Sequence, residues 1–190
     1  FSHGIAGLLF ALEVSQKRFS MSVSRSLLDW AFDQLEKEKY SVSGASLWPK
    51  MNQDVSIDMN NWCHGAPGIA LALLGCYRAT GKKAYYDLFR SAAQGAEEYS
   101  SGNNLSICCG WSGCAQLFVE AYRQFRRKSW LEKAQKFLPK YSRKVFSPEH
   151  YVPGSLGGLF LGPLGSAYTY DRISDPDLAL PGTGFAGNLK

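Results

Sequence analysis

The chain has 190 residues, of which 45% are apolar, 14% aromatic and 19% charged. This composition is typical of a globular protein with a buried core, and it excludes disordered and fibrous proteins. The net charge is +5, and the basic residues are scattered apart from the stretch 123–128, so we do not expect nucleic-acid binding. The longest mostly apolar stretch, 68–77, is about half as long as a membrane span, so we expect no transmembrane segment.

Two kinds of helical segment alternate along the chain. Three segments contain few polar residues, which is typical of buried helices: 8–13, 69–77 and 114–125. Three others have an apolar stripe on one side and charged residues on the other, as solvent-facing helices do: 21–40, 83–100 and 129–145. Residues 45–51, which include Trp48 and Pro49, fit a loop or an edge strand better than a helix.

A Gly-x-x-Gly element precedes each apolar segment and recurs near the C-terminus. The copies begin at Gly4, Gly65, Gly110 and Gly162, and Gly154 begins an alternative to the last copy. A period of about 40 to 50 residues is typical of repeats that contain two helices and stack on their neighbours. Glycine permits a tight turn and a close approach of the backbone where a buried helix begins, although a purely structural packing role would also fit. The sequence therefore predicts an all-α fold, an α/α toroid with alternating inner and outer helices and with these turns at one end.

Side chains of metal-binding type stand directly before three of these turns. They are His3, the pair Cys63 and His64, and the pair Cys108 and Cys109. If the turns meet, the three cysteines form a ligand set that suits Zn²⁺ and leaves one tetrahedral position open, as catalytic zinc sites do. His64 in place of a cysteine is the alternative ligand.

The number of cysteines also bears on the compartment. Five cysteines, two of them adjacent, do not form the framework of a small secreted disulfide-rich protein, and they indicate metal or reactive-thiol chemistry in the cytoplasm. Cys76 and Cys114 fall in apolar segments, where a free cysteine packs as a small apolar residue. His150 is expected in a surface loop, outside the site.

Three of these motifs resemble those of the LanC-like lanthionine cyclase family. They are Ser2-His3-Gly4-Ile5-Ala6-Gly7, Trp62-Cys63-His64-Gly65-Ala66-Pro67-Gly68-Ile69 and Cys108-Cys109-Gly110-Trp111-Ser112-Gly113. The end of the chain, with Gly162-Pro163-Leu164-Gly165-Ser166-Ala167-Tyr168, Asp175-Pro176 and Leu180-Pro181, resembles the C-terminal signature of that family. The resemblance covers nearly the whole chain but only about the C-terminal half of the family's toroid. It implies that residues 1–190, which begin with Phe1, are the C-terminal portion of a cyclase domain.

The resemblance also implies roles for individual residues. Zinc would be held by Cys63, Cys108 and Cys109, His3 would act as the acid and base, and Trp62 and His64 would line the substrate pocket. Many members carry histidine at the position of Cys109, and the three-cysteine variant resembles the cyclase domains of bifunctional LanM-type synthetases, which implies a fused N-terminal dehydratase.

The sequence departs from the family in two places. An active-site aspartate of the family would lie upstream of His3 and is absent from these 190 residues. Some cyclases carry an arginine just before the Trp-Cys pair, where this chain has Met59, Asn60 and Asn61.

The implied reaction joins cysteine thiols of a dehydrated precursor peptide to dehydroalanine or dehydrobutyrine as thioethers. His3 would protonate the enolate, and Glu149 or Asp58 would be the substitute donors. Two alternatives remain open: a peptide-binding module that has lost turnover, and a related enzyme that adds glutathione to dehydrated residues.

Overall fold

The computed structural model describes residues 4–49, 60–102, 104–138 and 158–180, and these ranges contain seven helices and one two-stranded antiparallel sheet. The elements are α1 (Ile5–Phe19), α2 (Arg25–Glu38), β1 (Tyr40–Val42), β2 (Ala45–Leu47), α3 (Ala66–Thr80), α4 (Lys83–Tyr99), α5 (Trp111–Phe125), α6 (Lys128–Lys136) and α7 (Pro163–Ser174). Within these ranges, no helix combines the length and the apolar character that a membrane crossing needs.

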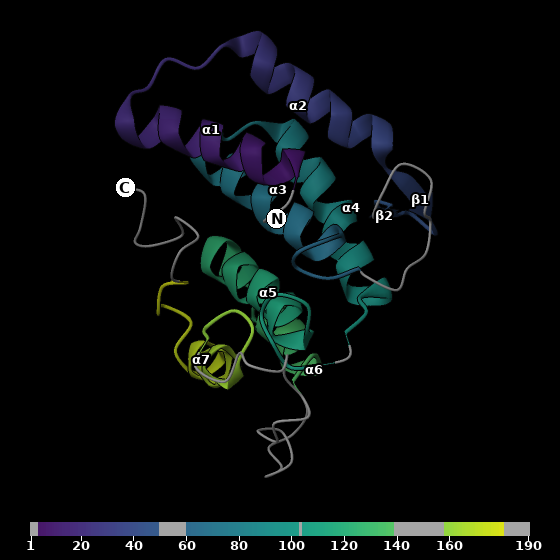
Figure 1. Ribbon diagram of the computed structural model, residues 1–190, viewed down its shortest axis with the longest axis vertical. Coiled ribbons are helices and arrows are strands. Elements are labelled where there is room, and N and C mark those ends of the chain that lie inside the picture. Colours follow the sequence, from purple (N-terminus) through teal and green to yellow (C-terminus); the bar gives the residue numbers. More distant parts are fainter. Residues whose placement is uncertain (1–3, 50–59, 103, 139–157, 181–190) are drawn as a thin grey trace.

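Inner and outer helices alternate as the sequence predicts. Each of α1, α3 and α5 packs against the next inner helix, and the last partner in this row is α7. The outer helices α2, α4 and α6 each pack on the inner helix that precedes them in the chain. In Figure 1 these layers follow one another from α1 and α2 at the top of the view to α5, α6 and α7 at the bottom. The most apolar inner helix, α3, is buried along nearly its whole length because neighbours cover it on several sides.

The Gly-x-x-Gly elements begin the inner helices. Gly4, Gly65, Gly110 and Gly162 are the residues that directly precede α1, α3, α5 and α7. The copy at Gly162 is therefore the one that starts a helix, whereas the alternative copy at Gly154 lies outside the described residues.

A β-hairpin interrupts the alternation of helices. The predicted helix 21–40 ends at Glu38, and Tyr40 pairs with Leu47 across a turn at Ser43 and Gly44. Both turn residues have positive φ, 50° and 86°, which is the conformation that a two-residue hairpin turn requires. The extended segment predicted at 45–51 is thus a strand over Ala45–Leu47, and residues 50 and 51 lie outside the described ranges.

A buried ion-pair network joins α3, α5 and α7 near their C-terminal ends. The Glu120 carboxylate of α5 accepts hydrogen bonds from Arg78 of α3 at 3.2 Å and from Arg123 at 2.9 Å. It also pairs with Arg172 of α7, and both Glu120 and Arg172 have 0% of the side chain exposed. Arg172 further donates to the side-chain amide oxygen Oε1 of Gln116. Burial lowers the pKa of Arg172, and the adjacent carboxylate opposes this shift.

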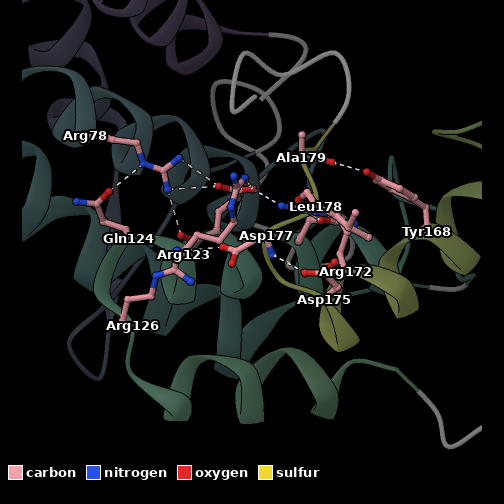
Figure 2. A network of polar contacts seen from close by, with 12 residues as sticks. Arg78, Arg123, Gln124, Arg126, Tyr168, Arg172, Asp175, Asp177, Leu178 and Ala179 are labelled. Carbon is pink, nitrogen blue, oxygen red and sulfur yellow. Dashed lines mark hydrogen bonds and ion pairs between the residues drawn. The ribbon is translucent and has the colours of Figure 1, made fainter. Parts of the chain in front are cut away.

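The same network holds the segment that follows α7. Arg172 Nε donates to the Leu178 carbonyl at 2.8 Å, and the Tyr168 hydroxyl donates to the Ala179 carbonyl at 2.6 Å. Figure 2 shows these contacts beside the arginines of α3 and α5. Residues from four parts of the chain therefore meet at the helix ends away from the Gly-x-x-Gly turns.

Candidate metal centre

The three predicted zinc ligands lie together. The sulfur atoms of Cys63, Cys108 and Cys109 are all within 4.8 Å of one another, and the last two are 3.5 Å apart. Cys63 comes from the loop before α3 and the other two from the loop before α5. Ligands of a tetrahedral zinc at a Zn–S distance of about 2.3 Å are roughly 3.8 Å apart. The three cysteines therefore offer the sulfur ligands that Zn²⁺ prefers, close enough for one ion to reach all of them when they are thiolates.

In the structure Cys63 and Cys108 form a disulfide, whereas Cys109 is free and half-buried. The sequence suggested metal-binding or reactive thiols at these positions. Their Cα atoms are 5.6 Å apart, within the usual range of about 4.4–6.8 Å for a disulfide, so the positions that let two thiols share a metal also let them pair. Zinc binds thiolates, so metal binding requires the reduced chain.

Backbone hydrogen bonds connect the loops that begin α3, α5 and α7. The Cys63 N–H donates to the Cys108 carbonyl at 3.2 Å, and the Cys108 N–H donates to the Phe160 carbonyl at 2.9 Å. The Cys109 N–H donates to the Ser106 hydroxyl at 3.3 Å. The turns of three inner helices thus meet at one end, as the sequence predicts, and their contacts fix the backbone of all three cysteines.

The electrostatic field at this end favours negative charge. Helices α1, α3 and α5 begin here, and none of them has an acidic residue in its first turn. A helix N-terminus carries roughly half a positive charge, which stabilises nearby thiolates. Three thiolates around Zn²⁺ sum to a charge of −1, so the helix ends offset part of this charge. Without a cation, burial raises the pKa of the Cys109 thiol.

A recess of about 110 Å³ adjoins Cys63. It is lined by Cys63 and His64 on one side and by the start of α1, Leu35, Trp48, Pro49 and Ile69 on the others. His64 thus lies at the recess, and its role in a substrate pocket stays a prediction. Trp62 is not among the lining residues, because its side chain is buried and packs on Phe160 with ring centroids 5.4 Å apart. His3 lies outside the described residues, but the next residue, Gly4, lines the same recess.

The remaining cysteines of the described residues are separate from this cluster. Cys76 and Cys114 are fully buried in α3 and α5. Burial raises the pKa of Cys114 to about 12 and that of Cys76 further. Both stay protonated at neutral pH, which agrees with a packing role. His150, predicted outside the site, and the substitute proton donors Glu149 and Asp58 lie outside the described residues.

Two buried asparagines of the segment before α3 escaped the sequence analysis. Asn60 and Asn61 drew notice only because they stand where some relatives carry arginine, yet both are buried and hydrogen-bonded to the loop of Cys63. The Asn at the position two residues before Cys63 is a usual acceptor for backbone N–H groups in tight turns, and this signal was available in the sequence.

Close packing at Gly113 gives a first prediction. A Cβ atom there would lie 2.7 Å from the Trp62 Cβ and would collide with the Ile107 carbonyl. We expect Gly113→Ala to push α5 away from the Trp62–Cys63 loop and to lower the free energy of unfolding by about 1–3 kcal/mol. The matched control is Gly4→Ser, because nothing lies within 4 Å of a Cβ at Gly4 and serine is a favoured N-cap. Equal thermal unfolding midpoints for the two variants would contradict this account.

Comparison with known proteins identifies the family and the fold of the chain. A family model of lanthionine synthetase C-like proteins matches residues 1–183. The solved structure of nisin cyclase has the same helical toroid fold, with a TM-score of 0.69 and 20% sequence identity. This match covers 90% of the present chain and 45% of the nisin cyclase chain, so the chain spans less than half the length of that structural relative. The predicted family and fold class are confirmed, and the chain belongs to the LanC-like family of lanthionine synthetase C-like proteins.

Proposed function

We propose that this chain carries the metal centre of a zinc-dependent lanthionine cyclase. The substrate is a dehydrated precursor peptide, and the product is a thioether-bridged ring. The observation that carries the proposal is the cluster of Cys63, Cys108 and Cys109 at the beginnings of two inner helices of a LanC-like fold. Three sulfur ligands leave the fourth position of a tetrahedral site for a substrate thiol.

The chemistry requires a thiolate at neutral pH. A free cysteine has a pKa near 8.5 and is mostly protonated at pH 7, and Zn²⁺ in this site would supply the charge that removes the proton. Cys63, Cys108 and Cys109 would hold the metal, and the hydrogen bonds within and between their loops keep the sulfurs together. The recess next to Cys63 and His64 gives room for substrate atoms beside the cluster.

The addition of the peptide thiol to the dehydrated residue needs no co-reactant. The peptide sulfur forms a bond to the β-carbon of dehydroalanine or dehydrobutyrine, and the π electrons of the C=C bond move to an enolate. A proton is then added at the α-carbon, so the peptide mass does not change. We assign this proton transfer to His3, because an imidazole with a pKa near 6.5 donates and accepts protons at neutral pH. Its neighbour Gly4 lines the recess that Cys63 and His64 share.

The test uses the complete polypeptide that contains this chain, reduced and loaded with zinc. A dehydrated peptide with one cysteine should lose its alkylatable thiol with no change in mass. Tight binding of the peptide with no loss of thiol would contradict turnover and favour a binding module. Faster consumption of glutathione than of the peptide thiol would favour the glutathione-adding alternative.

The proposal also covers the parent polypeptide and its location in the cell. We assign residues 1–190 to the C-terminal portion of a cyclase domain, with a fused N-terminal dehydratase as the source of the dehydrated peptide. Because the three thiols must stay reduced to bind zinc, a cytoplasmic location suits this activity.

The third cysteine should raise the reactivity of the bound substrate thiol. A site with three thiolates has one more negative charge than a site with two thiolates and a neutral imidazole, and this charge makes a bound sulfur more electron-rich. We therefore expect Cys109→His to keep zinc binding but to slow ring formation on the same peptide. Single-turnover rates at saturating peptide measure the effect. An equal or faster rate in Cys109→His would contradict this explanation.

A further inference from the structure

The side chain of Asn61 contacts the backbone of a predicted zinc ligand. Asn61 has only 3% of its surface exposed and stands two residues before Cys63. Its Oδ1 accepts hydrogen bonds from the Cys63 N–H at 3.0 Å and from the His64 N–H at 3.2 Å. One amide oxygen thus orients both peptide groups that flank the Cys63 side chain.

The neighbouring Asn60 has a different set of partners. Its Oδ1 accepts from the Ala66 N–H at the start of α3 at 2.7 Å, and its Nδ2 donates to the Gly95 carbonyl of α4 at 3.2 Å. Its backbone exchanges hydrogen bonds with Ser101 at 2.9 and 3.0 Å. Asn60 therefore anchors the loop to α3, α4 and the segment after α4, and Asn61 acts inside the loop.

The hydrogen bond to Asn61 also reaches the second sulfur-bearing loop. The Cys63 N–H is shared between Asn61 Oδ1 and the Cys108 carbonyl, and the Cys108 N–H continues to the Phe160 carbonyl. The position of the Cys63 amide decides where its Cα–Cβ bond points. A rotation of this peptide group would turn the Cys63 sulfur away from those of Cys108 and Cys109.

We propose that Asn61 is a positioning residue that sets the direction of the Cys63 sulfur for metal binding. This inference rests on the proposed zinc site. Removing the Oδ1 acceptor takes one hydrogen bond from the Cys63 N–H, which keeps the Cys108 carbonyl, and one from the His64 N–H, and the loop relaxes into other conformations. Residues that orient a ligand from behind typically change metal affinity about 10–100-fold when mutated.

The experiment compares Asn61→Ala, Asn61→Asp and Asn60→Ala with the wild type, all in reductant. Zinc affinity is measured by competition with a chromophoric chelator, the ligand geometry by the absorption of bound Co²⁺, and stability by thermal unfolding without metal. We expect Asn61→Ala to weaken zinc binding about 10–100-fold and to change the Co²⁺ absorption. Asn61→Asp keeps the acceptor oxygen and should restore most of the affinity.

Asn60→Ala is the control for a purely structural effect. It should lower the metal-free unfolding midpoint more than Asn61→Ala but leave zinc affinity within about threefold of wild type. Wild-type zinc affinity and wild-type Co²⁺ absorption in Asn61→Ala would overturn the inference. It would also be overturned if Asn60→Ala and Asn61→Ala lost zinc affinity equally and in proportion to their loss of stability. A wild-type chain that binds neither metal would instead overturn the proposed zinc site, so the two failures are distinguishable.

Discussion

The variant Cys63→Ala should lose zinc and form thioether rings about 3,000-fold more slowly than the wild type. At pH 7 a thiol with a pKa near 8.5 is about 3% ionised, so loss of metal activation alone costs roughly 30-fold in reactive thiolate. Loss of the anchor that places the sulfur near its target costs about another 100-fold. Both effects require Cys63 to act with Cys108 and Cys109, whose sulfurs lie within 4.8 Å of it. Bound zinc per chain and the rate of thiol loss in a dehydrated peptide are the measurements.

Cys76→Ala is the matched control for this variant. It also removes a buried sulfur from the chain, but Cys76 lies fully buried within α3 and outside the cluster. We expect it to keep full zinc stoichiometry and ring formation, with at most a modest loss of stability from the small cavity. If Cys63→Ala cyclised the peptide as fast as Cys76→Ala, the metal centre would have no part in the reaction.

The variant Glu120→Gln should cause the largest loss of stability. In the wild type the Glu120 carboxylate faces the guanidinium groups of Arg78, Arg123 and Arg172. In the variant the buried Arg172 would keep its positive charge without this anion. Removing one partner from a buried ion pair costs about 3–5 kcal/mol. For a chain of this size, the unfolding midpoint should fall by roughly 6–20 °C.

An exposed ion pair of the same region provides the comparison. Arg126 and Asp177 are 3.0 Å apart, with 53% and 69% of their side chains exposed. Asp177→Asn should therefore change stability by less than about 1 kcal/mol. Similar midpoints for Glu120→Gln and Asp177→Asn in thermal unfolding would show that the buried network does not hold α3, α5 and α7 together.

The alternation of helices was predictable because each layer leaves a separate pattern in the sequence. Segment 69–77 is apolar on all sides and becomes the buried α3, and segment 83–100 has one apolar side and becomes α4. The meeting of Cys63 with Cys108 was predictable for the same reason. Both residues precede a repeated turn, and equivalent turns of stacked repeats lie at the same end.

The buried charges were not predictable from periodicity. Glu120 and Arg123 lie in a segment expected to be a buried helix, and a pattern of polar and apolar residues cannot show which distant cations complete their pairing. The basic stretch 123–128 illustrates this point. Arg123 pairs with Glu120 one turn earlier in α5, whereas Arg126 pairs with Asp177 from the segment after α7, so the pair of Arg126 is a tertiary contact.

The pairing of β1 with β2 and the partners of Asn60 and Asn61 escaped prediction, although 45–51 was predicted as a loop or edge strand and an asparagine before Cys63 is a turn signal. Strands of three residues carry too little alternation to be recognised, and only the turn at Ser43 and Gly44 marks the hairpin. The roles of Asn60 and Asn61 depend on which backbone N–H groups their oxygens reach, and this is a property of the folded loop. The Cys63–Cys108 pairing likewise follows from the distance between the two loops in the fold.

X-ray absorption at the zinc edge of the reduced, zinc-loaded protein tests the three-sulfur site most directly. Our account predicts one zinc per chain, surrounded by three sulfur atoms at about 2.3 Å and one lighter atom. Coordination by two or fewer sulfur atoms, or a reduced protein that retains no zinc, would contradict it.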